Sequence, residues 1–109
     1  MRTPTRVWGH LKSAMDSAPT ITIYVPGPLR VYCDGASKLS LSAPTVRAAL
    51  DQLELHHEPL HRNIRDEAGA VRRHLGIFVN SDHVRDLQGL DTALAPGDVV
   101  TILPAVSGG

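Results

Sequence analysis

The sequence predicts an α+β fold with two layers, in which one main helix packs across one face of a mixed β-sheet. Residues 20–25 alternate polar and apolar side chains, and residues 99–103 are rich in β-branched side chains, so both segments predict strands. Between them, residues 46–53 carry apolar side chains at helical spacing. The chain has 109 residues, which fits a single domain.

The N-terminal part of this domain is expected to form a hairpin. In the first strand the alternation turns Ile21, Ile23 and Val25 inward. A Pro-Gly-Pro run ends that strand, and residues 29–32 are expected to extend or restart it. Residues 38–42 alternate again and predict the returning strand.

One segment predicts the main helix. Thr45 is expected to be its N-cap, because a threonine hydroxyl can accept a free backbone N–H of the first turn. Pro59 sets the latest point at which the helix can end. Residues 60–69 are expected to form one helical turn and a loop. The apolar stripe of the helix consists of Val46, Ala49, Leu50 and Leu53.

The C-terminal half predicts three further strands. Residues 75–80 form an apolar strand, residues 83–84 a brief returning strand, and residues 99–103 the last strand after a turn at 95–98. The single helix therefore follows two strands and precedes three. This order places the first and last strands side by side at the centre of the sheet, as in β-grasp folds.

Composition excludes several classes of function. The formal net charge is zero, which gives no electrostatic support for binding nucleic acid. No apolar run approaches the roughly 20 residues of a membrane span, and a lone cysteine, Cys33, fits a reducing compartment. We therefore expect a cytoplasmic protein without membrane contact. Residues 1–18 are expected to form a mobile extension and residues 19–109 the domain, with a flexible tail at 104–109.

The chemistry of the chain is expected to lie at its C-terminus. Val100 and Ile102 would anchor the last strand in the core, and Pro104 would end the ladder because it has no N–H. The terminal Gly108 and Gly109 lack a Cβ, so their backbone can enter a narrow channel. The α-carboxylate of the last residue is then a group that ATP can activate as an acyl-adenylate.

The whole run from Pro96 to Gly109 resembles the C-terminus of the ThiS/MoaD family of ubiquitin-like sulfur carriers. The shared features are a Gly-Asp turn, an apolar strand, a proline-containing tail and a terminal Gly-Gly. The resemblance extends over residues 20–109, and the tail from Ile102 to Val106 is most similar to CysO-type carriers. The stretch 58–74 has no counterpart in a minimal ThiS-type chain.

This resemblance implies a role for each tail residue. Gly109 would bear a thiocarboxylate, Gly108 would give the tail its narrow profile, and Val106 and Ser107 would lie in the channel of a partner. The chain is expected to be a carrier and not an enzyme. It has no phosphate-binding loop of its own, so it should bind no cofactor, and ATP would be bound by the activating partner.

The resemblance also implies two kinds of partner. One is an adenylating enzyme of the ubiquitin-activating type, similar to MoeB or ThiF, which would dock on the sheet face opposite the helix. On the last strand, Val99, Thr101 and Leu103 occupy that face. The other is a sulfur acceptor, such as a cysteine synthase, a molybdopterin synthase large subunit or a thiazole synthase. Related carriers also serve sulfur-containing natural products.

Three alternatives remain open at the level of sequence. The chain could be a ubiquitin-like modifier joined to lysines through Gly109, or a β-grasp binding subunit whose Gly-Gly is incidental. The third is a zinc hydrolase, because His57 to His61 matches HExxH. That motif requires a helix, and Pro59 at its centre opposes one, so we expect no zinc site and read these histidines as a solvated face.

Two further features are expected to be structural. Arg72, Arg73 and His74 lie near Arg62 and Arg65 in a basic cluster, which we interpret as a solvated loop, with docking of an acidic partner as the alternative. Cys33 is expected to be a half-buried structural thiol.

Overall fold

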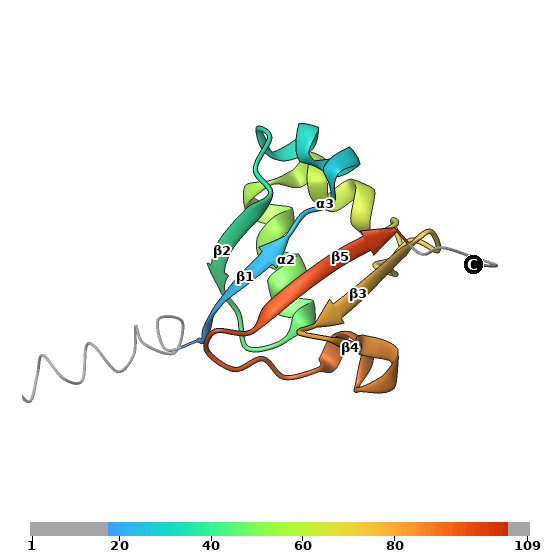
Figure 1. The fold of residues 1–109 in the computed structure, drawn as a ribbon. Helices are drawn as coiled ribbons and strands as arrows, with labels where there is room; N and C mark the ends of the chain where they lie inside the picture. Colours follow the sequence, from blue (N-terminus) through green and yellow to red (C-terminus); the bar gives the residue numbers. More distant parts are fainter. Residues whose placement is uncertain (1–17, 105–109) are drawn as a thin grey trace, which may run out of the picture.

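A five-stranded mixed sheet forms one layer of the structure, a computed structural model in which residues 18–104 are described. The predicted extension 1–18 and tail 104–109 therefore lie, apart from Ala18 and Pro104, outside the described residues. The strand order is β2-β1-β5-β3-β4 (Figure 1). The strands are β1 (Thr20–Tyr24), β2 (Lys38–Ser42), β3 (Leu75–Val79), β4 (Asp82–His83) and β5 (Val99–Pro104).

The first and last strands lie side by side at the centre of the sheet, as predicted. β1 and β5 run parallel, with Ile23 opposite Val100. The two other long pairings, β1 with β2 and β5 with β3, are antiparallel. Residues Ile23, Val100 and Ile102 are fully buried, because alternate side chains of each strand point toward the helices.

Helix α2 (Val46–His56) covers one face of the sheet and confirms the main predicted helix (Figure 1). The Thr45 hydroxyl accepts a hydrogen bond from the Ala48 N–H at 3.1 Å, so the predicted N-cap is correct. The helix ends before Pro59, also as predicted. Its predicted apolar stripe is completely buried and consists of Val46, Ala49, Leu50 and Leu53.

The prediction of a single helix was wrong, because a second helix, α3 (Glu58–Ile64), follows α2 after one residue. Pro59 lies in the first turn of α3, where a missing N–H removes no helical hydrogen bond. The residue that breaks α2 thus begins a new helix. Leu60 and Ile64, one turn apart, are fully buried and tie α3 to the core. The layer opposite the sheet therefore contains both helices.

The predicted extension of the first strand over residues 29–32 was also wrong. Residues Gly27–Cys33 form a 3₁₀ helix, η1. Pro28 favours this geometry, because its ring fixes φ near the helical value in the first turn. The Leu29 N–H donates to the Pro26 carbonyl at 2.9 Å, which turns the chain away from the sheet immediately after β1.

Candidate functional site

Two turns fix the start of β5, the strand that leads to the predicted tail. The Asp98 N–H donates to the Ala95 carbonyl at 3.0 Å, and Gly97 between them has a φ of 86°. A turn of this kind requires a positive φ at its third residue, which suits glycine. On the other side, Asn80 has a φ of 57°, and its amide oxygen accepts the Val99 N–H at 3.1 Å. The predicted turn at 95–98 is therefore confirmed.

At its other end, β5 is held by β3 alone. β1 stops pairing with β5 at Thr101, whereas β3 pairs with β5 as far as Leu75 opposite Pro104. β5 extends one residue beyond the predicted strand 99–103, because Pro104, which was assigned to the tail, is its last residue. The predicted tail residues Val106, Ser107, Gly108 and Gly109 lie outside the described residues, so their roles stay predictions.

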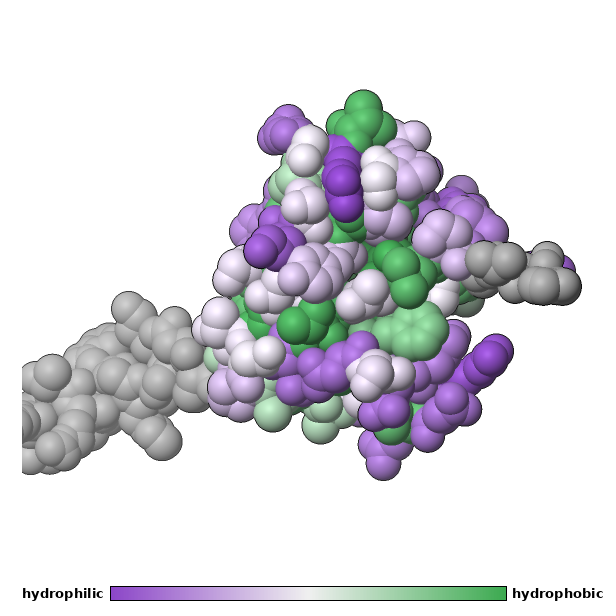
Figure 2. All heavy atoms as spheres, in the orientation of Figure 1, coloured by the Kyte–Doolittle hydropathy of each residue, from purple (hydrophilic) through white to green (hydrophobic). Residues whose placement is uncertain are grey.

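The three residues predicted for partner docking do lie on the sheet face opposite the helices. They alternate with Val100 and Ile102, which are fully buried. Val99 and Thr101 are half-buried, and Leu103 is 43% exposed. Figure 2 shows this face, with hydrophobic side chains gathered over β5 and β3 and strongly hydrophilic atoms around them. That a partner docks here remains a prediction.

The register adds residues to this face that sequence reasoning did not single out. Thr101 lies between Tyr24 on β1 and Phe78 on β3, and Lys38 and His83 continue the row on the outer strands. The Lys38 ammonium lies 5.9 Å from the centre of the Tyr24 ring. Strand alternation alone could have placed Tyr24 outward, because its neighbours in the strand were predicted to face inward.

Side chains pack closely on β3 where the open face of the sheet lies nearest to the last residues of β5. Gly76 pairs with Leu103, and a Cβ on this glycine would lie 3.3 Å from Nε2 of His83 and 3.5 Å from Phe78. The rings of Phe78 and His83 meet at 4.9 Å and 59°. The His83 Nδ1 accepts the Arg85 backbone N–H at 3.1 Å. The imidazole is thus held over the backbone of β3 beside Leu103.

The opposite side of the domain contains the HExxH match. His57 lies between the helices, with a φ of −143° and a ψ of 61°, so the continuous helix that such a zinc site needs is broken there. The reading of these histidines as a solvated face was wrong for His61. Its Nε2 accepts a hydrogen bond from Nε of Arg65 at 2.8 Å. Burial lowers the pKa of His61, and the nearby Arg65 guanidinium lowers it further.

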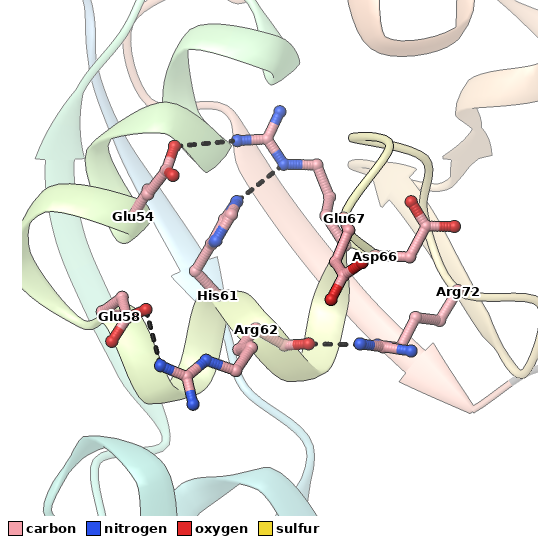
Figure 3. A pocket seen from close by; sticks show the side chains of 8 residues that line it. Glu54, Glu58, His61, Arg62, Asp66, Glu67 and Arg72 are labelled. Carbon is pink, nitrogen blue, oxygen red and sulfur yellow. Dashed lines mark hydrogen bonds and ion pairs between the residues drawn. The ribbon is translucent and has the colours of Figure 1, made fainter.

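Arg65 also corrects the interpretation of the basic cluster as a solvated loop. Its side chain is only 7% exposed and donates to Asp51 at 2.8 Å, with Glu54 at 3.9 Å. Arg65 therefore joins α2 to the end of α3. It lines an open pocket of about 330 Å³, which Figure 3 shows between the helices and the following loop. The other lining residues are Glu54, Glu58, His61, Arg62, Asp66, Glu67 and Arg72.

The charges in this pocket are largely matched within the chain. Arg62 pairs with Glu58 at 2.7 Å, and Nε of Arg72 donates to the Arg62 carbonyl at 3.0 Å (Figure 3). Asp66 accepts two backbone N–H groups of its own turn. These contacts hold the α3–β3 connection in place, and they involve neither β5 nor the open face of the sheet.

Cys33 is more buried than predicted, with 3% of its surface exposed at the end of η1. Its Sγ donates to the Ala36 carbonyl at 3.4 Å. Burial raises the pKa of the thiol, so the neutral form is favoured. Among residues 18–104 no group of three or more His, Cys, Asp or Glu side chains is placed to hold a metal ion. No helix in that range is long and apolar enough to cross a membrane.

Comparison with known proteins gives a family match over most of the chain. The model of the ThiS family matches residues 23–109, which include β5 and the terminal Gly-Gly. The sulfur carrier protein CysO of Mycobacterium tuberculosis is 38% identical over 91 residues, covering 82% of this chain and 98% of that protein. Its crystal structure superimposes with a TM-score of 0.73 over 79% of this chain and 99% of the other.

Two further proteins resemble this chain over more than half of its length. A chain in the crystal structure of the Amycolatopsis orientalis BexX/CysO complex is 32% identical, with a TM-score of 0.70, covering 82% of this chain and 99% of that one. Small archaeal modifier protein 3 of Haloferax volcanii is 35% identical over 65 residues, or 60% of this chain and 70% of that protein. With these neighbours and the strand order described above, the predicted β-grasp, ubiquitin-like fold is confirmed.

Proposed function

This chain belongs to the ThiS family, and we propose that it is a sulfur carrier that holds sulfur as a thiocarboxylate on Gly109. The observation that supports this role most strongly is the 38% identity to a sulfur carrier, over 82% of this chain. The chain keeps the two features that the chemistry requires, a β-grasp domain and a C-terminal Gly-Gly.

The proposed cycle has three steps. The carboxylate of Gly109 attacks the α-phosphorus of ATP and releases pyrophosphate, which gives an acyl-adenylate. A sulfur donor such as hydrosulfide then attacks the acyl carbon and displaces AMP, which leaves a thiocarboxylate. This ionised sulfur attacks an electrophilic carbon of the acceptor substrate, by addition to a double bond or by displacing a leaving group, and forms a thioester. Water then cleaves the bond between the acyl carbon and the sulfur, which leaves the sulfur on the acceptor and restores the Gly109 carboxylate. The anion is the reactive form, as it is for cysteine thiols.

Every step of this cycle, beginning with the binding of ATP, depends on a partner. We propose that a MoeB/ThiF-type adenylating enzyme binds ATP and docks on the face that carries Val99, Thr101 and Leu103. Val106, Ser107 and Gly108 would then lie in its channel. The similarity to CysO favours an acceptor enzyme in cysteine synthesis, such as a cysteine synthase, over molybdopterin synthase or thiazole synthase. This cycle is proposed to run in the cytoplasm.

Intact mass spectrometry tests the proposal. The chain would be incubated with ATP, a sulfide source and a MoeB/ThiF-type enzyme that is active on a CysO-type carrier. We expect replacement of one oxygen by sulfur, localised to Gly109 by a reagent that alkylates thiocarboxylates. The alkylation is necessary because oxidation of Met1 or Met15 gives nearly the same mass change. A chain without Gly108 and Gly109 is the control and should remain unmodified.

Failure of modification at Gly109, with an enzyme that loads its own carrier in the same assay, would count against the carrier role. A second function is favoured by the similarity to small archaeal modifier protein 3. In that case Gly109 would be joined to lysines of other proteins. Adenylation without sulfur transfer, together with higher-mass conjugates linked through Gly109 in cells, would support the modifier function instead.

A further inference from the structure

The positively charged side chains of the domain differ in how they are neutralised. On the helix side, Arg62 pairs with Glu58 and the nearly buried Arg65 pairs with Asp51. Elsewhere among residues 18–104 no carboxylate lies within ion-pair distance of Arg30, Lys38, Arg72, Arg73 or Arg85. Charges that a domain leaves unmatched are available to a partner.

Three of these unmatched cations surround the sheet end where β5 finishes. Nε of Arg30 donates to the Val25 carbonyl at 3.0 Å, just beyond the end of β1. Lys38 lies over the Tyr24 ring on the open face. Arg73 is exposed in the turn before β3, whose first residue pairs with the last residue of β5.

The open face between these cations carries no carboxylate on its strands. Its centre is apolar and aromatic, with Leu103 at 43% and Tyr24 at 42% exposure, and Phe78 partly exposed beside them (Figure 2). An apolar centre with charges at its margin is the usual anatomy of a protein interface. Apart from Lys38 and His83, the strand residues that face outward are threonine, serine, glycine, aromatic or aliphatic.

We propose that the adenylating enzyme that receives the tail carries carboxylates around an apolar docking surface, matched to Arg30, Lys38 and Arg73. This inference rests on the proposed function and specifies the chemistry of its first partner. The three cations lie on different segments around the end of β5, so pairing with all of them fixes the rotation of the domain on the enzyme. During the approach, that rotation points β5 and the tail toward the active site of the enzyme.

Charges at the margin of an interface act mainly on the rate at which the two partners associate. They steer the approach of the partner, and salt weakens them because they stay in contact with solvent. The proposal therefore predicts that kcat/KM for adenylation falls with ionic strength. By contrast, kcat should change little, since the chemistry takes place at Gly109, away from these side chains.

The test compares the wild-type chain with a charge-reversed Lys38→Glu/Arg73→Glu variant in ATP–pyrophosphate exchange. The enzyme is the one that loads the wild-type chain in the mass experiment above. Arg85→Glu is the matched control, because Arg85 is also exposed and unpaired among residues 18–104 but follows β4, the edge strand opposite the one that carries Lys38. A neutral Lys38→Gln/Arg73→Gln variant should give an intermediate result, and thermal unfolding verifies that all variants are folded.

We expect charge reversal to lower kcat/KM about tenfold at about 50 mM salt and far less at about 500 mM, with Arg85→Glu within about twofold of wild type. An unchanged kcat/KM, or an equal loss in Arg85→Glu, would overturn the inference and leave the carrier function intact. If the wild-type chain is never adenylated, that result contradicts both the carrier function and the inference about the charges of the partner. A salt-sensitive wild-type dimer that charge reversal dissociates would identify a second copy as the occupant and also overturn the proposal.

Discussion

The helix side and the sheet side of this domain use similar residue types differently. On the helix side, Arg65 is buried and bonded to His61 and Asp51, so its charge stabilises the junction of α2 and α3. On the sheet side, Lys38 has no such partner among the described residues. The apolar strand residues also differ between the two sides. Those that face the helices, such as Ile102, are buried, whereas Leu103 on the open face is exposed. One layer maintains the fold, and the other carries the exposed face on which we propose that the partner docks.

Strand β5 contains this contrast within two consecutive residues. Ile102 is fully buried under the helices, and Leu103 lies 43% exposed on the open face. Both are branched aliphatic side chains of similar volume. Their different surroundings arise only from the alternation of the strand, so substitutions here separate the contribution to stability from the contribution to docking.

The largest effect is expected from truncating these two side chains separately. Ile102→Ala should lower the free energy of unfolding by about 2–5 kcal/mol, because it leaves a cavity in the core. Leu103→Ala should lower it by less than about 1 kcal/mol but raise the KM for adenylation. Urea unfolding and ATP–pyrophosphate exchange measure the two quantities. Similar losses of stability in both variants would contradict the division of the strand.

A smaller loss of stability is expected from Arg65→Ala. The substitution removes a nearly buried guanidinium and its hydrogen bonds to His61 and Asp51, for which about 1.5–3 kcal/mol is typical. The value should lie at the lower end, because Asp51 is 58% exposed and is rehydrated. Arg62→Ala, which breaks the exposed pair with Glu58, is the control and should cost under about 1 kcal/mol. Equal losses in urea unfolding would refute the structural role of Arg65.

Gly76→Val tests the packing of the open face. The new side chain would displace the His83 ring, which lies 3.3 Å from the position of the Cβ. We expect a loss of about 1 kcal/mol, partly offset by the better strand propensity of valine. A His83→Ala background removes the obstacle, so the loss should shrink there. Additive effects of the two substitutions in a double-mutant cycle would show that the contact carries no energy.

The smallest effect is a pH dependence from His61. Its pKa in the folded chain lies below the ordinary value of 6.5, so the unfolded chain takes up the proton first as the pH falls. The contribution of neutral His61 to the stability of the fold is therefore complete above about pH 6.5. It is lost toward lower pH, where a protonated Nε2 can no longer accept the Arg65 N–H. His61→Gln should reduce the slope of stability against pH in this window. The exposed His56→Gln is the control, and an equal change there would argue against this assignment.

Much of the fold follows from local patterns in the sequence. The alternation at Ile21 and Ile23, the cap at Thr45 and the turn at Pro96-Gly97 each correspond to one structural element. The errors came from prolines. Pro28 and Pro59 were treated as ends of elements, but each lies in the first turn of a helix, where proline is well tolerated.

The candidate site was only partly predictable. Its outward residues on β5 follow from strand alternation, but the neighbours on other strands depend on register. The contact of Phe78 with His83 and the placement of Lys38 over Tyr24 arise from pairing between distant segments. The buried position of Arg65 was missed for the same reason, because its partner Asp51 lies on the preceding helix.

The parallel pairing of β1 with β5 also has a consequence for biosynthesis. β1 emerges from the ribosome early, but one of its two neighbours in the sheet is the last strand to be made. Contacts between such distant segments form late, because the loop between them must close first. The domain therefore completes its core only when synthesis has reached β5. A chain whose synthesis stops before this strand therefore lacks both the strand that joins β1 to β3 and the terminal Gly108 and Gly109.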